Sequence, residues 1–336
     1  MIDEKIKIYV TADVLRILQK DMEAFEFYKS DKRTLNKNAF LTKLIVNYSD
    51  DYHRRETELF NYLKKTIGAQ TSLQDTRLKN LCFDISEHLN KRNAAPNKEK
   101  FDALISLKPT KESRAAIDYI EAYALEGSGL SEYFRNMFSA YAALPQDKRE
   151  EIIFKPQKLA LDQAISEHKR VFLSVSHDKK SSLEFSPYAL TATKEELHCY
   201  VVGAEDEKCI PLRLSRIRSV TVLNKHTHFE EDQLFLFQKM LSQGPQFFYQ
   251  PLEEDIVVEF TERGVEKFKK MFVHRPTPVA INGLKYTFQC SYTQAIQYFA
   301  RFGADAYVVS PAFVQEKLLQ FFSSARTCYQ KRKNKS

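Results

Sequence analysis

The stretch "KIKIYVTADVLRILQKD", residues 5–21, decides how the first part of the chain folds. Apolar residues alternate with Lys5, Lys7 and Tyr9, which is the two-residue period of a β-strand. From Val14 onward apolar residues recur every three or four positions, so a helix follows with no room for a hairpin. A lone strand cannot satisfy its backbone hydrogen-bonding groups, and this one therefore needs a partner strand from elsewhere.

A second helix is predicted soon after the first. Asn36 is a good N-cap, and apolar residues follow it with helical spacing. Strand, helix, basic loop and helix over residues 1–50 is the ribbon-helix-helix pattern. In that fold two such units pair their strands antiparallel, and the ribbon enters the major groove of DNA. The alternative is an ordinary strand at the edge of another sheet.

The pattern assigns DNA-binding roles to two groups of residues. Outward strand residues would contact base edges, and the start of the second helix would hold a phosphate through its free N–H groups. The expected strand contacts are Lys5, Lys7 and Tyr9, and the expected helix-start contacts are Thr34, Asn36 and Lys37.

A segment further along repeats the same order. It begins at Leu104 with "LISLKPTKESRAAIDYIEAYAL". Laid over the first segment, Ile105 falls on Ile6 and Thr110 falls on Thr11, and a helical pattern follows in both. Residues 104–144 therefore look like a divergent second ribbon-helix-helix unit.

This repeat offers a partner for the first strand. Strand 5–10 could pair with strand 104–109, whose outward residues would be Ser106 and Lys108, and Ser131 would cap the last helix. The alternative is that strand 5–10 pairs with its own copy in a homodimer, and that 104–144 is plain helical packing. The rest of residues 51–155 reads as charge-rich helices, with an exposed helix from Pro145.

From Leu159 onward the pattern changes to five short strands separated by polar turns, which predicts a small closed β-barrel. The runs "ALDQAISEHKRVFLSV", "SPYAL", "CYVVG" and "PLRLSRI" resemble the WYL domain in order and spacing. The chain has no Trp, and Cys199, Tyr200 and Val201 stand at the run for which that family is named. We place this domain at 156–226.

The resemblance implies an Sm-like, SH3-type barrel that senses a nucleotide or nucleic-acid fragment in regulators with an N-terminal DNA-binding domain. The positions that match the polar groove of the family are Ser186, Tyr188, Tyr200, Arg213 and Arg216. Arginine pairs with phosphate and tyrosine offers a stacking face and a hydroxyl, so the chemistry is suitable. The alternative is that Arg213 and Arg216 are solvated or salt-bridged.

The C-terminal part, residues 250–330, alternates strands and helices. The expected order is βαββαβ followed by a helix, which is ferredoxin-like, with a hairpin turn at Asn282–Gly283. The run "FARFGADAYVVSP" resembles the extension that commonly follows WYL domains, where its role is oligomerisation or ligand gating.

Composition sets the broad class. The length of 336 residues leaves room for two or three domains, and 43% hydrophobic and 12% aromatic residues indicate a globular protein. Together with the expected strands and helices, this predicts an α+β multidomain fold. A net charge of +7 is compatible with a polyanion partner. The scattered cysteines, the lack of a signal peptide and the lack of a long apolar run favour the cytoplasm and argue against a membrane. No metal-ligand, cofactor or catalytic motif is present, so we expect no enzyme, cofactor or metal.

Two functions are consistent with these features. The first is a transcriptional regulator that binds duplex DNA and whose barrel senses a nucleotide-like ligand. The second is a single-stranded RNA- or DNA-binding protein similar to the WYL accessory proteins of RNA-targeting CRISPR systems. We expect a homodimer, although one ribbon per chain would let a monomer bind.

Overall fold

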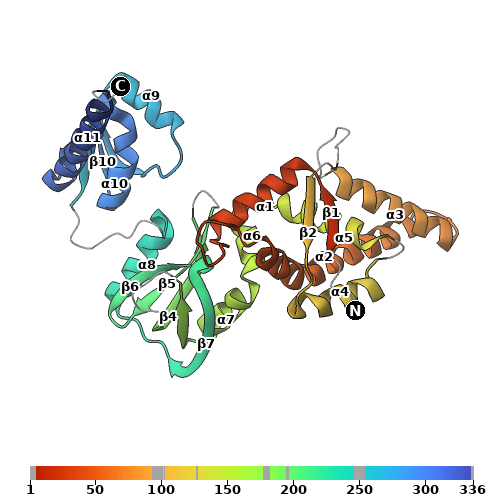
Figure 1. The fold of residues 1–336 in the computed structure, drawn as a ribbon. Helices are drawn as coiled ribbons and strands as arrows, with labels where there is room; N and C mark the ends of the chain where they lie inside the picture. Colours follow the sequence, from red (N-terminus) through yellow and green to blue (C-terminus); the bar gives the residue numbers. More distant parts are fainter. Residues whose placement is uncertain are drawn as a thin grey trace. The chain divides into compact units, whose positions relative to one another are not determined.

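The computed structural model describes residues 5–92, 101, 103–125, 128–176, 182–193, 197–245 and 254–333. These residues form a mixed α+β fold with three antiparallel sheets (Figure 1). The chain divides into two compact units: Met1–Ala160 with Leu214–Arg218, and Leu161–Arg213 with Ser219–Ser336. In the described residues, no helix combines the length and the apolar character that crossing a membrane requires.

A two-stranded ribbon lies in the first unit. Strand β1 (Ile6–Val10) pairs antiparallel with β2 (Ala103–Leu107) (Figure 1). Ile8 stands opposite Ile105. On the inward face the first residue of each strand is partly buried and the next two are fully buried, namely Ile8 and Val10 in β1 and Ile105 and Leu107 in β2. Of the two predicted pairings, the one within a single chain is therefore the one observed.

The strand-helix-helix order occurs twice, as predicted. Strand β1 leads to α1 (Ala12–Ala24) and α2 (Lys37–Gly68), and β2 leads to α4 (Lys111–Tyr123) and α5 (Leu130–Ala142). The first helix of each pair begins in the same way, because the hydroxyls of Thr11 and Thr110 both accept a backbone N–H three residues on. The overlay of Thr110 on Thr11 is thus confirmed.

The predicted overlay of the two strands is wrong by two residues. Thr11 follows β1 directly, whereas Lys108 and Pro109 separate β2 from Thr110. Ile105 therefore takes the place of Ile8 and not of Ile6. The physical reason is Pro109, which has no N–H to give to a strand ladder and stands in the connection instead.

The first unit also contains α3 (Asp75–Arg92) and α6 (Gln146–Ile153), and its boundary with the second unit falls within α7 (Lys155–Ser166). We predicted α6 to be exposed, and this is wrong because Arg149 and Glu150 are buried. The Arg149 guanidinium makes two hydrogen bonds to the Asp21 carboxylate of α1, at 2.6 and 2.9 Å. A charged sequence that is buried by such pairing cannot be told from an exposed one by its composition.

The five predicted strands form one sheet, which belongs to the second unit except for the first two residues of β7. They are β3 (Lys169–Val175), β4 (Ser182–Ala192), β5 (Cys199–Glu205), β6 (Lys208–Arg213) and β7 (Ile217–His226), in the order β6-β5-β4-β3-β7. The predicted closed barrel is not observed, because β6 and β7 stand at opposite edges. A 3₁₀ turn at Leu214–Arg216 interrupts the run between them.

Helix α8 (Glu231–Gln243) packs on this sheet and makes a small core with β5 and β6. Phe237 and Met240 of the helix are buried against Val202 and Cys209. Gly203 of β5 lies so close to β4 that a Cβ atom there would stand 2.2 Å from the carbonyl oxygen of Ser186. This close approach requires glycine.

A four-stranded sheet follows, with the predicted order of elements. Its strands are β8 (Ile256–Phe260), β9 (Pro278–Asn282), β10 (Lys285–Phe288) and β11 (Ala306–Ser310), arranged β11-β8-β10-β9. Its helices are α9 (Glu262–Lys270), α10 (Tyr292–Phe299) and α11 (Ala312–Lys333), with a 3₁₀ segment Ala300–Asp305 before β11. Gly283 has φ +57°, as the predicted hairpin turn between β9 and β10 requires. The core of this part is rich in aromatic residues and includes Phe260, Phe268, Phe288 and Phe299.

Candidate nucleic-acid and ligand sites

One face of the ribbon is exposed, and we call it the ribbon face. Lys7 and Tyr9 of β1 lie there opposite Ser106 and Leu104 of β2. Tyr9 and Leu104 are 45% and 49% exposed, which is high for large apolar side chains in a sheet. Leu104 was missed by the sequence analysis, although strand alternation places it on the same face as Ser106.

The two ends of the ribbon face differ in charge. Lys5 precedes β1 and Lys108 follows β2, and the antiparallel register places both at the end that carries Lys7. Both are exposed, although they lie outside the strands as assigned. One end of the ribbon face is therefore basic, and the other carries Tyr9 and Leu104.

Helices α2 and α5 hold the backbone of the ribbon. The Ser131 hydroxyl donates to the carbonyl oxygen of Lys7 at 2.9 Å, and Arg135 Nε donates to that of Tyr9 at 2.9 Å. Ser131 was predicted to cap α5, which is wrong because Gly129 is the N-cap. Directly after β2, the Asn38 amide donates to Lys108 O at 3.0 Å and accepts from Lys108 N at 2.8 Å. These contacts satisfy carbonyl groups that an unprotected edge would offer to another strand.

Two of the residues that were predicted to hold a phosphate at the start of α2 make hydrogen bonds within the chain. Asn36 caps its own helix by accepting from Ala39 N at 3.2 Å. Thr34 donates both its N–H and its hydroxyl to the carboxylate of Asp31, at 2.8 and 2.6 Å. Hydrogen bonds from Thr34, and then from Arg33, lower the pKa of Asp31 to about 2, so a carboxylate stands beside Thr34 at neutral pH. Lys37, the third residue of the predicted site, is an exposed cation in the first turn of α2.

On the five-stranded sheet the structure brings two of the predicted groove residues together. Tyr200 of β5 stands opposite Arg213 of β6, and both are half-buried. Arg213 Nη2 lies 2.9 Å from Nδ1 of His198. A guanidinium can only donate, so this hydrogen bond requires an unprotonated His198 Nδ1. His198 was missed, although its position two residues before Tyr200 put it at the same end of the strand.

Two other groove residues lie apart from this pair or are used for packing. Ser186 is buried and pairs with Ala204, four residues along β5 from Tyr200 and so about 13 Å away. The Tyr188 ring stacks on Phe237 of α8, with ring centroids 4.6 Å apart. One face of Tyr188 is thus covered by the protein itself.

Arg216 belongs to the first unit. Its Nε lies 3.5 Å from the Glu26 carboxylate, and its side chain is half exposed. Ser215 N donates to the carboxylate of Glu150 at 3.1 Å, and Gln157 donates to the carbonyl of Arg218 at 3.0 Å. The salt-bridged alternative is therefore the arrangement that the structure shows for Arg216.

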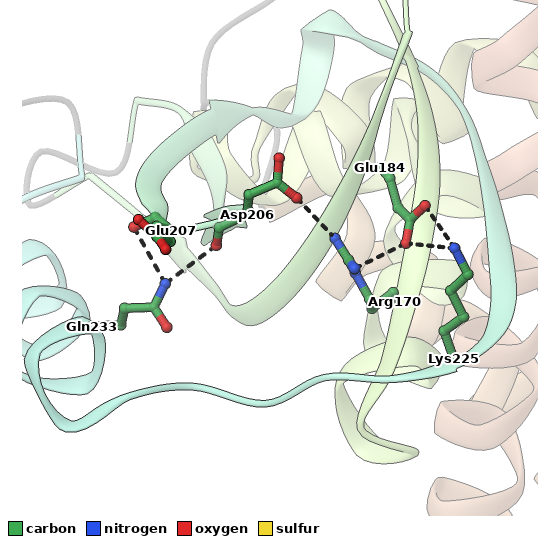
Figure 2. Close-up of polar contacts among 6 residues, drawn as sticks. All are labelled: Arg170, Glu184, Asp206, Glu207, Lys225 and Gln233. Carbon is green, nitrogen blue, oxygen red and sulfur yellow. Dashed lines mark hydrogen bonds and ion pairs between the residues drawn. The ribbon is translucent and has the colours of Figure 1, made fainter.

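Other charges of the five-stranded sheet are also paired. Figure 2 shows the Arg170 guanidinium between two carboxylates, 3.1 Å from Glu184 and 3.6 Å from Asp206. Lys225 of β7 approaches Glu184 to 3.0 Å. Gln233 of α8 donates to the backbone carbonyl of Asp206 at 3.3 Å, which links the helix to the β5–β6 turn. This network lies across β3, β4 and β7 and neutralises cations that an anionic ligand would otherwise meet.

Comparisons with known proteins show the fold. The chain is similar to a solved structure of a CRISPR Cas-related protein, with a TM-score of 0.67 and 18% identity, over 98% of this chain and 95% of that one. It is weakly similar to the proteasome accessory factor B/C of Arthrobacter aurescens, with a TM-score of 0.27 and 13% identity, over 69% of this chain and 39% of the other. The second similarity is too low to support an argument. No family model matches the chain. No curated protein matches it.

Within the described residues, no group of three or more His, Cys, Asp or Glu could hold a metal ion.

Proposed function

We propose that the protein is a nucleic-acid-binding regulator whose ribbon face contacts duplex DNA. The observation that carries the proposal is the intrachain ribbon β1–β2, buried on one face and exposed on the other. A two-stranded ribbon fits the major groove, and outward residues on such a ribbon reach base edges. Because both strands come from one chain, a single molecule carries a complete ribbon.

The chemistry of the ribbon face suits an asymmetric site. Lys5, Lys7 and Lys108 would contact phosphates or guanine at one end, and Tyr9 and Leu104 would contact thymine methyl groups at the other. The two strands present different residues at equivalent places, so we expect an operator whose half-sites differ.

For the second unit we keep the family assignments as proposals. The five-stranded sheet would be a WYL domain, and the C-terminal sheet with its helices a ferredoxin-like extension. Tyr200 and Arg213 would bind a nucleotide-like ligand that shifts the protein between states of different DNA affinity. We propose binding and no catalysis, with assembly as a homodimer.

A second candidate function is supported by the similarity to a CRISPR Cas-related protein over nearly the whole length of both chains. In this function the sheet itself would bind single-stranded RNA and so modulate a CRISPR effector. Tyr200 would stack on a base and Arg213 would hold the backbone.

The two functions are separated by binding measurements on duplex DNA and single-stranded RNA at two salt concentrations. For the regulator, Lys7→Ala weakens duplex binding and lowers the salt slope by about 1, whereas Arg213→Gln leaves duplex affinity unchanged. Lys20→Ala, which removes an exposed lysine from α1, is the charge-matched control. If Arg213→Gln abolishes RNA binding and Lys7→Ala changes nothing, the accessory function holds and the regulator fails. If no variant changes any affinity, both fail.

A further inference from the structure

A cavity in the C-terminal domain has walls that combine cations with apolar surface. It has a volume of about 300 Å³ and lies between α9, the connection after it, and strands β9 and β10. The side chains that matter for its chemistry are Lys269, Arg275, Phe268, Ile281 and Tyr286. Its volume is at the lower end of the range for small-molecule sites.

The connection that forms one wall is fixed by hydrogen bonds from side chains of the following helical segment. The carbonyl oxygen of Met271 accepts from the Tyr298 hydroxyl at 2.8 Å, and that of Val273 accepts from Arg301 at 2.9 Å. The carbonyl of His274 accepts from the Gln294 amide at 3.3 Å. Three backbone carbonyls are thus positioned within four residues.

The Arg275 side chain, which belongs to the same connection, is also fixed by contacts within the protein. Arg275 Nη1 donates to the carbonyl of Phe268 at 3.3 Å, and its guanidinium lies over the rings of Phe268 and Phe272, 5.4 and 4.7 Å from their centroids. His274 adopts φ +62°, an uncommon conformation for a residue with a side chain. The guanidinium is therefore held in place by its backbone contact and by two rings.

Burial of apolar surface does not explain why this connection is fixed so closely. Phe272 is 66% exposed and Val273 is 48% exposed, so the connection adds little to the core. A strained backbone that is held by surrounding hydrogen bonds is typical of a preformed binding site.

We propose that this cavity binds a mononucleotide, with its phosphate on Lys269 and Arg275 and its base against the apolar wall of Ile281 and Tyr286. Guanidinium and ammonium groups are the usual partners of a phosphate, and aromatic and aliphatic surfaces accept a planar base. Lys269 also pairs with Glu266 at 2.9 Å, but both side chains are more than half exposed. An exposed pair of this kind is weak, so a phosphate can replace the carboxylate.

The test is calorimetric titration of the full chain with AMP, adenosine and inorganic phosphate. Lys269→Gln weakens AMP binding by about tenfold, the scale of a lost hydrogen bond to a charged group. Lys270→Gln is its matched control, because Lys270 is the next residue on α9 and does not line the cavity. Ile281→Glu weakens AMP binding as well, whereas Val279→Glu does not, although both residues lie on β9 and are 59% and 55% exposed.

Several results would overturn the proposal. It fails if AMP shows no saturable binding, or if Lys269→Gln and Ile281→Glu leave the affinity unchanged while the proteins melt normally. It also fails if adenosine or phosphate alone binds as tightly as AMP. If Arg213→Gln abolishes AMP binding and the cavity variants do not, the ligand sits on the five-stranded sheet, which supports the proposed regulator and rejects this second site.

Discussion

The hydroxyl of Ser131 donates a hydrogen bond to the backbone carbonyl of Lys7 across 124 positions of sequence. Asn38 makes two hydrogen bonds with the backbone of Lys108, the residue that directly follows β2. Ser131 and Asn38 are each the second residue of the second helix in their strand-helix-helix segment. Each segment therefore holds the strand of the other, and the two segments form a single folding unit.

The first prediction concerns this contact. Ser131→Ala removes the donor and should lower the free energy of unfolding by about 0.5–1.5 kcal/mol, the usual net value of one hydrogen bond. Urea unfolding measures the change. Ser139→Ala on the same helix is the control, because Ser139 donates only to the carbonyl of Arg135 one turn back. Equal effects of the two substitutions would show that the contact with Lys7 adds nothing to stability.

The ribbon was predictable in kind but not in register. Alternation around Ile8 and Ile105 revealed both strands, and Thr11 and Thr110 marked both helix starts. The alignment of the two strands depends on how many residues join each strand to its helix. The connection from β2 to α4, which contains Pro109, is two residues longer than the connection from β1 to α1. Local periodicity does not carry that information.

The residues of the candidate sites were predictable only where strand alternation or the WYL-like runs mark them. Lys7 and Tyr9 follow from strand alternation, and Tyr200 and Arg213 follow from the order of the WYL-like runs. The contact of His198 with Arg213 joins the start of β5 to the end of β6. The cavity beside Arg275 likewise depends on hydrogen bonds between residues that are 20 to 28 positions apart in the chain, and no local pattern indicates such contacts.

The second prediction tests the buried ion pair between α1 and α6. Asp21 is fully buried, and it accepts hydrogen bonds from Arg149 and from the Tyr141 hydroxyl at 2.9 Å. Burial, and then the negative charge of Asp21, raise the pKa of Tyr141 well above its ordinary value, so the hydroxyl stays a donor. Arg149→Met should lower the free energy of unfolding by about 3–5 kcal/mol, because it leaves a buried carboxylate without its cation.

An exposed ion pair on α1, the helix that carries Asp21, provides the control for this substitution. Arg16 lies 2.6 Å from Asp13, and the two side chains are 77% and 69% exposed. Arg16→Met should change the free energy of unfolding by less than about 1 kcal/mol, as is usual for surface pairs. Chemical denaturation measures the free energy of unfolding of both variants. If Arg149→Met lowers it as little as Arg16→Met does, the buried ion pair does not contribute to stability as described.

The third prediction concerns the close approach of β4 and β5. Gly203→Ala would place a Cβ atom 2.2 Å from Ser186 O and 2.6 Å from the Phe185 ring. Strands must separate to admit it, so we expect a loss of at least about 2 kcal/mol, in the range of overpacked cores. Gly129→Ala is the comparison, because no atom lies within 4 Å of the new methyl group. Thermal unfolding that is equally affected by both substitutions would contradict the packing described.

The fourth prediction concerns the reactivity of the cysteines. Cys82, Cys199, Cys209 and Cys290 are buried and Cys328 is exposed, so one thiol should react quickly with a thiol reagent in the native state at pH 8 and all five in urea. Burial raises the pKa of Cys209 to about 11, which keeps that thiol protonated. Because its folded pKa lies above the unfolded value, its contribution to stability is present below pH 9 and is lost as the pH rises toward 11. Reaction rates followed against pH test the protonation of Cys209, urea unfolding followed against pH tests its contribution to stability, and Cys328→Ser should remove the fast phase. A second fast thiol at pH 8 would mean that one of the cores described here opens in solution.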